Sequence, residues 1–459
     1  MRGILVSVLV VALLGGVLLA REPVNVADPK DKTIIEKFLV HTAKVPARYT
    51  PERCRAVAAK CPEDYTWQVF PQVNMTLTAY ELSGEAKYLD MFVQTFDNMR
   101  SAMTKGPDGY LGWYGKALST FQDPRNPNKK VDVIITSFRT VESLARFAEL
   151  AGADASLRRK YEGQRAEYLA LAENHLVKKW IARANYVDLG KGGAIFRTHS
   201  GLKDVKGHLT QPHNKHSIII RALLGLYRTT GKDEYMRMAV KLGTRYKRSL
   251  TLKAGHYEWN YWDPAGAWDV HPGDAAKWKH WIGVEHKGGY YSSSLSQAVA
   301  LYHHGVVFDK ADIDRFVKTQ VGVAWNGDLA NPKWARCDGT TSAKYMKGSY
   351  ICAALAPFHE KVYALLYTGA RQDERLKNAA HSWQGGPVAN GWLSGKYVTC
   401  PAAKAGKQIH LEAGRRFLKK SNNQALLRSL AFRVAGSGYA APRTPKAMKP
   451  MLAEPKSGI

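Results

Sequence analysis

The side chains best suited to chemistry fall into four short stretches, and the first is Gln211-Pro-His-Asn-Lys-His216. This stretch directly precedes an apolar segment, so its residues lie where a predicted helix begins. Asn214 can donate a hydrogen bond to a substrate carboxylate, although Asn214 or Ser217 could instead cap the helix. His213 and His216 are three residues apart, a spacing that permits a metal site. Because no acidic residue at a recognised spacing accompanies them, we expect no metal here.

The second stretch runs from residue 255 to residue 281 and is rich in aromatic residues. Proline and glycine interrupt it, which argues against a helix of core aromatics. Aromatic faces in such a loop can stack on sugar rings, and the alternative is that they anchor the loop. The stretch holds five of the twelve tryptophans, Trp259, Trp262, Trp268, Trp278 and Trp281.

The third and fourth stretches are residues 285–292 and 334–345. His286 lies beside two glycines, which allow a ligand to approach the backbone, and it could move a proton or neutralise charge. Arg336 carries a planar guanidinium that can grip a carboxylate through two hydrogen bonds. Tyr345 is the candidate catalytic phenol, with Tyr290 or Tyr291 as rivals. Structural roles for these residues remain the alternative.

Together these residue types suit the removal of a proton next to a carboxylate. In a uronic-acid polymer, the C5 proton becomes removable only when the carboxylate charge is neutralised and the developing enolate is stabilised. Asn, His and Arg supply the donors, and a tyrosine can act as base, acid or both. This chemistry requires no metal or other cofactor. Residues expected to bind the substrate are His213, His216, His256, Trp259, Trp262, Tyr290, Tyr291 and Trp113.

Helical periodicity dominates the rest of the chain, and strand-like alternation is scarce. Several segments end in a glycine that suits the left-handed C′ position of a helix, namely Gly84, Gly152, Gly231, Gly369 and, more loosely, Gly305. Their spacing of 64 to 79 residues fits two helices and one long loop. The helical segments are expected at 73–103, 131–150, 157–181, 217–227, 234–250, 293–304 and 351–366.

This pattern predicts an all-α fold, an α/α toroid of six to seven helical hairpins. The long loops 185–214 and 253–291 contain Gly, His, Trp and Tyr, unlike the connectors of a scaffold solenoid. We expect them to converge on one cleft. The predicted organisation is a signal peptide over residues 1–20, one catalytic domain over 21–440 and a poorly ordered tail over 441–459.

Charge and the N-terminus indicate an exported protein that meets a polyanion. Arg2 and the apolar run from Ile4 to Leu14 are typical of a secretory signal, and the run is too short for a full membrane span. Lys and Arg total 67 against 39 Asp and Glu, a net charge of +28. Such a field attracts acidic polymers. No nucleic-acid-binding motif is present, so an acidic polysaccharide is the expected partner. Of the five cysteines, Cys54 and Cys61 could form a disulfide.

With these residues in order, the sequence resembles the toroidal polysaccharide lyases, most closely the family-38 lyases that act on glucuronan and mannuronate-type alginate. That family carries Asn, His, Arg and Tyr in this order, with the arginine about fifty residues beyond the histidine; here His286 and Arg336 are fifty apart. The resemblance implies that Asn214 and Arg336 neutralise the carboxylate and that His286 assists. It also implies that Tyr345 takes the C5 proton and protonates the leaving oxygen.

Other functions fit parts of the same pattern. A glycoside hydrolase on a toroid would use two carboxyl groups from Glu258, Asp263, Asp269 and Glu285. A C5-epimerase would share the proton abstraction but leave the chain length unchanged. A non-catalytic protein would bind acidic glycans without releasing fragments.

Overall fold

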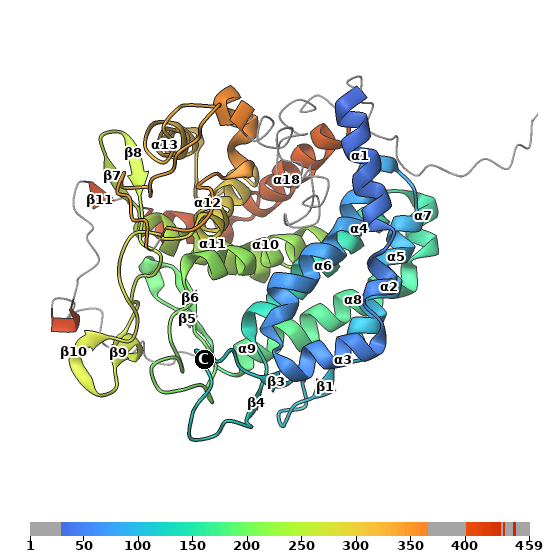
Figure 1. The fold of residues 1–459 in the computed structure, drawn as a ribbon, viewed down its shortest axis with the longest axis horizontal. Coiled ribbons are helices and arrows are strands. Elements are labelled where there is room, and N and C mark those ends of the chain that lie inside the picture. The colour runs from blue at the N-terminus through green and yellow to red at the C-terminus, as the bar shows by residue number, and fades with distance from the viewer. Residues whose placement is uncertain are drawn as a thin grey trace, which may run out of the picture.

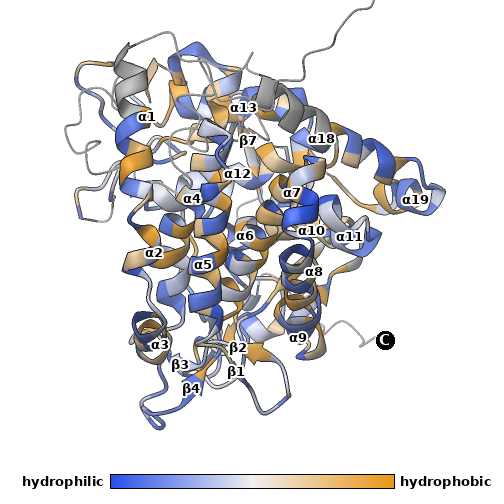
Figure 2. Ribbon diagram, turned by 90° about the vertical axis from the view of Figure 1, so that its right-hand side faces the viewer, coloured by the Kyte–Doolittle hydropathy of each residue, from blue (hydrophilic) through white to orange (hydrophobic). Residues whose placement is uncertain are grey.

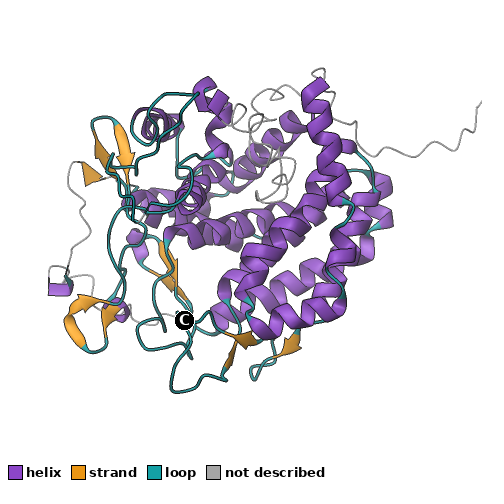
Figure 3. Ribbon diagram, in the orientation of Figure 1, coloured by secondary structure: helices purple, strands orange, loops and turns teal. Residues whose placement is uncertain are grey.

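The computed structural model describes residues 29–344, 346–362, 364–365, 401–432, 435–436 and 444–446. Helices make up most of this part of the chain, and the strands are two to five residues long (Figures 1 and 3). The prediction of a mainly helical chain is therefore confirmed. The predicted signal peptide, Gly369 and Tyr345 lie outside the described residues. None of the described helices is long and apolar enough to cross a bilayer.

The first half of the described chain holds nine α-helices and two short π-helices, with β-strands only in the connections. The helices are α1 (Pro29–Thr42), α2 (Val45–Arg48), α3 (Pro51–Lys60), α4 (Phe70–Ser83), α5 (Lys87–Arg100), α6 (Ile134–Gly152), α7 (Ala155–Lys160), α8 (Glu162–Leu171) and α9 (Lys178–Ala182). The π-helices are Tyr65–Val69 and Ala172–Val177. The strands are β1 (Thr104–Lys105), β2 (Leu111–Gly112), β3 (Gly115–Lys116) and β4 (Lys130–Val131).

The second half continues with helices separated by loops that contain β-hairpins. Its α-helices are α10 (His213–Thr230), α11 (Asp233–Arg248), α12 (Gly288–His303), α13 (Lys310–Gly322), α18 (Pro401–Leu418) and α19 (Ser421–Ser429). Its 3-10 helices are Gly190–Gly192, Ala267–Asp269 and Ala353–Phe358. Its strands are β5 (Tyr186–Asp188), β6 (Ala194–Phe196), β7 (Thr251–Lys253), β8 (His256–Glu258), β9 (Val270–His271), β10 (Asp274–Trp278) and β11 (Ala435–Gly436).

Four helices form an inner layer that carries most of the core. Along the chain, α4 contacts α6, α6 contacts α10, and α10 contacts α12. Most residues of α4, α6 and α10 are buried on every side, as expected for helices enclosed by others. Figure 1 shows α6 and α10 in the middle of the molecule. The first turn of α10 therefore starts from a rigid element.

A second layer of helices covers the first. Helices α5, α8, α11 and α13 pack against α4, α6, α10 and α12 respectively. In α5 the buried residues, which include Leu89, Phe92 and Phe96, lie on one face. Figure 2 accordingly shows hydrophilic and hydrophobic turns side by side along α5 and α8. Each of these inner helices thus has an outer partner, and α4–α5, α10–α11 and α12–α13 are consecutive in the chain.

Glycine ends several of these helices as predicted. Gly84 after α4 and Gly231 after α10 have φ of 71° and 73°, and Gly305 after α12 has φ of 65°. A residue with a Cβ is strained in this left-handed region. Gly152 differs, because it is the last residue of α6 and has no positive φ. A Cβ there would lie 2.7 Å from Arg165 Nη2, so Gly152 instead makes room for that side chain.

Ion pairs join the inner helices at matching positions. Arg221 of α10 donates to Glu142 of α6 at 2.7 Å. Two turns further along, Arg228 of α10 donates to Glu149 of α6 at 2.8 Å. Partly buried pairs of this kind lose less strength to solvent than exposed pairs, so they help fix the register of α10 against α6.

Several details differ from the sequence-based expectations. Residues 351–358 do not form the predicted α-helix, because Pro357 cannot donate a backbone hydrogen bond and a 3-10 helix forms instead. The segment 157–181 is divided among α7, α8, a π-helix and α9. The long loop 185–214 contains the hairpin of β5 and β6. Cys54 and Cys61 are both free thiols, so the disulfide that the sequence left open is absent.

Candidate functional site

Backbone hydrogen bonds bring the four chemistry-bearing stretches together. The N–H of His213 donates to the carbonyl oxygen of Tyr261 (3.3 Å), and the N–H of Tyr261 donates to that of Gly283 (2.8 Å). The N–H of Trp259 donates to the sulfur of Cys337 at 3.4 Å, next to Arg336. Residues distant in sequence therefore share one region, where α10 and α12 begin.

Asn214 occupies the first turn of α10 and is almost completely buried, with 1% of its surface exposed. No side chain caps this helix, so the alternative in which Asn214 or Ser217 acts as the N-cap is wrong. The carbonyl oxygen of Asn214 accepts a hydrogen bond from Ser293 Oγ of α12 at 3.0 Å. Its side-chain Oδ1 has no partner in the described part of the chain. Asn214 is thus held by its backbone, while its side-chain Oδ1 has no described partner.

The two histidines beside Asn214 have partners within the protein. His213 Nε2 lies 3.0 Å from Asp263 Oδ2. His216 Nε2 accepts a hydrogen bond from the N–H of Phe196 at 2.9 Å. Burial, followed by the neighbouring charges of His213 and Arg245, lowers the pKa of His216 to about 3, so the ring is neutral. Among the described residues, no three His, Cys, Asp or Glu side chains are grouped to hold a metal ion.

His286 lies just before α12 among aromatic rings. Its ring meets those of Tyr261 and Trp281 edge-on, with centroids 5.4 and 5.5 Å away. About a quarter of the side chain is exposed. Burial and then the charges of Lys287 and Arg336 lower its pKa, which favours the neutral imidazole at neutral pH. His286 is therefore both accessible and able to accept a proton.

Of the two glycines after His286, Gly288 is required by the packing of the protein's own backbone. A Cβ on Gly288 would lie 2.0 Å from the carbonyl oxygen of Ser349, so only glycine fits against that backbone. Lys287 pairs with Lys347 in an isolated bridge beside it. Gly289 has open space around it instead. The sequence predicted that these glycines let a ligand approach the backbone. At Gly288 the group that approaches is instead the backbone of Ser349, which joins the third stretch to the region that follows the fourth.

Arg336 lies in a tight turn stabilised by its own residues. Its Nε donates to Thr340 Oγ1 at 2.8 Å, and Gly339 adopts a φ of 79° within the turn. No acidic side chain of the described chain forms an ion pair with Arg336, although its charge lowers the pKa of His286. The guanidinium therefore lies near His286 with capacity for an external carboxylate.

Glu285 is the least expected group in this region. Its side chain is fully buried, and its Oε1 accepts a hydrogen bond from the N–H of His286 at 3.1 Å, while Oε2 has no described partner. Burial raises its pKa well above the usual value, although backbone N–H groups and Lys287 oppose this. Burial therefore favours the protonated carboxyl group. Of the four carboxylates considered for a hydrolase, it is the one with a free oxygen and no cationic partner.

The other three carboxylates are engaged. Asp263 holds His213, and its second oxygen accepts from Asn260 Nδ2 at 2.8 Å. Asp269 accepts hydrogen bonds from Thr210 and Ala265, and burial raises its pKa to about 6. Glu258 pairs with Lys253 at 3.1 Å and lies 3.4 Å from His256. These interactions fix loops and leave few carboxylates for catalysis.

Sequence reasoning missed three buried polar groups around Asn214, those of Tyr246, Tyr350 and Gln297. Tyr246 OH, Tyr350 OH and Gln297 Oε1, like the OH of the predicted Tyr291, have no partner among the described residues. The Tyr246 ring packs 5.2 Å from His213, and Tyr291 packs 5.7 Å from Tyr350. Unpaired buried polar groups are rare in proteins, so their concentration here indicates a polar site rather than a closed core.

The tryptophans mainly anchor the loops, contrary to the prediction of exposed faces. Trp259 and Trp262 are 2% and 0% exposed, and Trp262 Nε1 donates to the carbonyl of Thr210. Trp113 is 1% exposed and donates to the carbonyl of Met99, within the core formed with Tyr65 and Phe70. Trp281 is 49% exposed and stands beside His286. Trp281 is thus the tryptophan best placed to meet a sugar ring.

The remaining predicted binding residues are distributed around this centre. Tyr290 stacks on Tyr261 at 5.4 Å and lies 6.1 Å from the His286 ring, so it is part of the same aromatic group. His256 lies on β8 with Glu258. Tyr291 is fully buried against Trp259. No family model, curated protein or solved structure matches this chain, so the geometry of the site stands alone as the guide to function.

Proposed function

We propose that this protein is an exported lyase that cleaves a uronic-acid polysaccharide of the glucuronan or alginate type by β-elimination. The observation that carries the proposal is the grouping of Asn214, His286 and Arg336 in one region of a strongly basic protein, where Arg336 lies near His286 and forms no ion pair with a described acidic residue. Such donors suit a substrate that brings its own carboxylate. We further propose that the paired helical layers form an α/α toroid around this site.

In the proposed reaction, Asn214 and Arg336 neutralise the C5 carboxylate of the bound sugar. His286 assists as a neutral donor at the developing enolate. Tyr345 accepts the C5 proton, the C5–H electron pair forms the C4–C5 double bond, and the C4–O bond breaks. The leaving oxygen then takes a proton from the tyrosine. The products are one new non-reducing end with an unsaturated uronide and one ordinary sugar end.

The principal alternative is a glycoside hydrolase that uses Glu285 as its acid. The raised pKa of Glu285 suits an acid, but a hydrolase also needs a second carboxylate across the bond. Asp263 and Asp269 are committed to His213 and to Thr210, and Glu258 pairs with Lys253. This distribution favours elimination over hydrolysis.

The decisive experiment incubates the full chain with glucuronan, polymannuronate, polyguluronate, pectate and glycosaminoglycans. Ultraviolet absorbance of the unsaturated uronide and the number of reducing ends are followed together. A lyase raises both signals in equal molar amounts on at least one polymer. Reducing ends without ultraviolet absorbance would establish hydrolysis instead. Binding of a polymer without either signal would indicate a non-catalytic glycan-binding protein, and epimerised sugars in an uncut chain would indicate an epimerase.

A further inference from the structure

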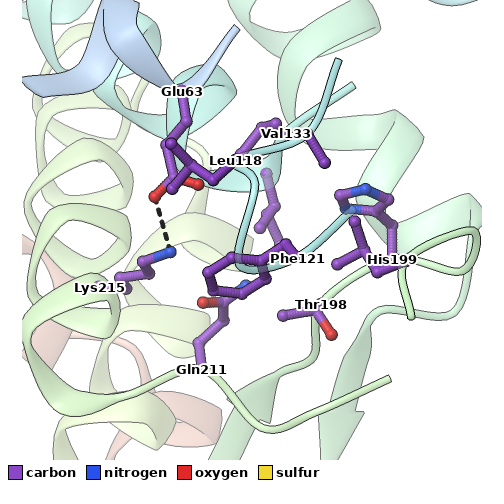
Figure 4. Close-up of a pocket in the computed structure, with 11 residues that line it drawn as sticks. Glu63, Leu118, Phe121, Val133, Thr198, His199, Gln211 and Lys215 are labelled. Atoms are coloured by element: carbon purple, nitrogen blue, oxygen red, sulfur yellow. Dashed lines mark hydrogen bonds and ion pairs between the residues drawn. The ribbon is translucent and has the colours of Figure 1, made fainter. Parts of the chain in front are cut away.

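A small pocket lies beside the first turn of α10, which contributes Lys215 to its lining. Its volume is about 20 Å³, and Glu63, Phe121, His199, Gln211 and Lys215 are among the residues that line it. Figure 4 shows Lys215 and Glu63 joined across the pocket, with Phe121, Gln211 and His199 around its other sides. Gln211 and Lys215 flank His213 and Asn214 in the sequence, so the pocket adjoins the candidate site.

Buried polar atoms face this pocket without a described partner. The Gln211 side chain is 97% buried, since the residue exposes 3% of its surface, and its Oε1 has no hydrogen bond. Both ring nitrogens of His199 are likewise hidden from solvent and unpaired. Leaving such atoms without partners destabilises the folded state, and hydroxyl groups of a ligand would offset this. The pocket is therefore built for a polar group.

Two lysines meet over the ring of Phe121. The Nζ atoms of Lys206 and Lys215 lie 5.5 and 5.4 Å from its centroid. Lys215 is neutralised by Glu63 at 2.9 Å. Lys206 forms no ion pair with any described acidic residue, and burial and then the charges of Lys203 and Lys215 lower its pKa. Lys206 is therefore a half-buried cation close to other cations, and a bound anion would stabilise its charged form.

A chain of contacts connects the segment that carries Lys206 to the candidate catalytic residue His286. His280 stacks on Trp262 at 5.5 Å and lies 5.5 Å from the Tyr261 ring, which in turn meets His286. Lys279, next to His280, donates to the carbonyl of Gly207 at 2.9 Å, beside Lys206. The segment 203–207 is thus tied to the loop that carries His280 and leads to His286.

We infer that Lys206, supported by Lys215, Gln211 and His199, forms a second carboxylate-binding subsite, which holds a uronate adjacent to the one at Asn214 and Arg336. This inference rests on the proposed function, because it assumes that the ligand is a polyuronate. The ammonium group of Lys206 pairs with the carboxylate. Gln211 and His199 hydrogen-bond the neighbouring hydroxyl groups. Two occupied subsites would align the chain across the bond to be cut.

The test measures binding rather than cleavage. Binding of hexamers of glucuronate or mannuronate is followed by calorimetry in an Asn214→Ala background, with and without Lys206→Gln. We expect Lys206→Gln to weaken binding about tenfold, as for the loss of one charge-assisted hydrogen bond, and to reduce its salt dependence. Lys206→Arg retains the charge and should restore most of the affinity. Carboxyl-reduced hexamers should not distinguish the variants.

Lys318→Gln is the matched control, because Lys318 is an exposed residue of the outer helix α13. It removes the same charge and should leave binding unchanged. Equal affinity in Lys206→Gln and Lys318→Gln would overturn the subsite while leaving the lyase proposal intact. Failure of every hexamer to bind would also overturn it. Binding that depends on Lys206 without any cleavage by the unmodified protein would support the subsite and reject the lyase.

Discussion

His213 and Asp263 form a buried pair in which the imidazole Nε2 lies 3.0 Å from the carboxylate Oδ2. The pair joins the first turn of α10 to the aromatic loop, and Asn260 donates to the second carboxylate oxygen. Because Nε2 is occupied, only His213 Nδ1 remains, and it has no described partner. A carboxylate that fixes an imidazole in this way determines which nitrogen faces the site. The pair therefore positions the turn that carries Asn214.

Replacing Asp263 with alanine should destabilise the protein, since His213 would be left buried without its partner. We expect the free energy of unfolding to fall by about 3 kcal/mol, as for the removal of one member of a buried pair. Urea unfolding followed by circular dichroism measures the change. Asp274→Ala is the control, because this carboxylate on β10 pairs with the exposed Lys277. An unchanged stability in Asp263→Ala would mean that the pair does not fix the turn.

Arg336→Ala should lower kcat/KM on the active polyuronate by about 100-fold or more, the usual effect of losing one preorganised donor. Arg336→Lys should recover only part of the rate, because an ammonium group cannot form the two-pronged contact. The melting temperature should not change, since the Arg336 side chain forms one described hydrogen bond, to Thr340. Arg55→Ala provides the matched loss of an exposed arginine, which pairs with Glu52. Near-normal turnover in Arg336→Ala would remove this residue from the site.

Tyr345→Phe should lower kcat by at least about 100-fold if this phenol carries the proton. Tyr291→Phe should have a much smaller effect on kcat. Burial raises the pKa of Tyr291 well above its usual value, so its phenolate is inaccessible at working pH. Initial rates of both variants on one polymer make the comparison direct. A large loss in Tyr291→Phe with a normal rate in Tyr345→Phe would reverse the assignment.

The helical class and much of the helical-hairpin order could be predicted from periodicity, because buried faces recur along segments such as 131–150 and 234–250. The glycine turns at Gly84 and Gly231 were also predictable, since a left-handed helix end demands this residue. The helix predicted over 351–366 is wrong for residues 353–358, which form a 3-10 helix that contains Pro357.

The residues of the candidate site were harder to predict from the sequence than the helices. Tyr246 and Gln297 lie on helices whose spacing suggests core or surface, and only the fold shows that Tyr246 OH and Gln297 Oε1 are buried without a described partner. The tryptophans of the aromatic loop look exposed because proline and glycine interrupt them, yet Trp259 and Trp262 fill the space behind the loop. A local sequence pattern can indicate which residues are suited to chemistry. It cannot show whether they are buried, because burial depends on contacts between segments that are distant in the sequence.

The stability of the protein should decrease between pH 6.5 and 5 because of buried histidines. The pKa of His216 is lowered to about 3 by burial, whereas an unfolded histidine titrates near 6.5. Below pH 6.5 the unfolded chain therefore binds a proton that the folded chain does not. His216 should cost about 1.4 kcal/mol of unfolding free energy per pH unit in this window. Its contribution is absent above pH 6.5.

His216→Gln tests this dependence, since a glutamine oxygen can still accept the N–H of Phe196. Urea unfolding at pH 7.5, 6 and 5 should show a shallower loss of stability in the variant, by about one proton. His271→Gln, on β9 where the histidine is half-buried, should keep the slope of the unmodified protein. Parallel slopes in all three proteins would show that His216 titrates normally in the folded state.

Glu285→Gln should stabilise the protein at pH 8 and leave elimination active. Burial raises the pKa of Glu285, so the folded chain keeps a proton that the unfolded chain loses above about pH 4.5. Stability from this group is complete below that pH and decreases as the pH rises toward the folded pKa. An amide has no proton to lose, so the variant should lack this decrease, as urea unfolding at pH 5 and pH 8 would show.

The same substitution separates the two catalytic proposals. A hydrolase that used Glu285 as its acid would lose turnover, because an amide cannot protonate the leaving oxygen. A lyase that relies on Asn214, His286 and Arg336 should retain most of its ultraviolet signal. Loss of activity together with a gain in stability at pH 8 would therefore assign the chemistry to Glu285, since a folding defect could not explain it.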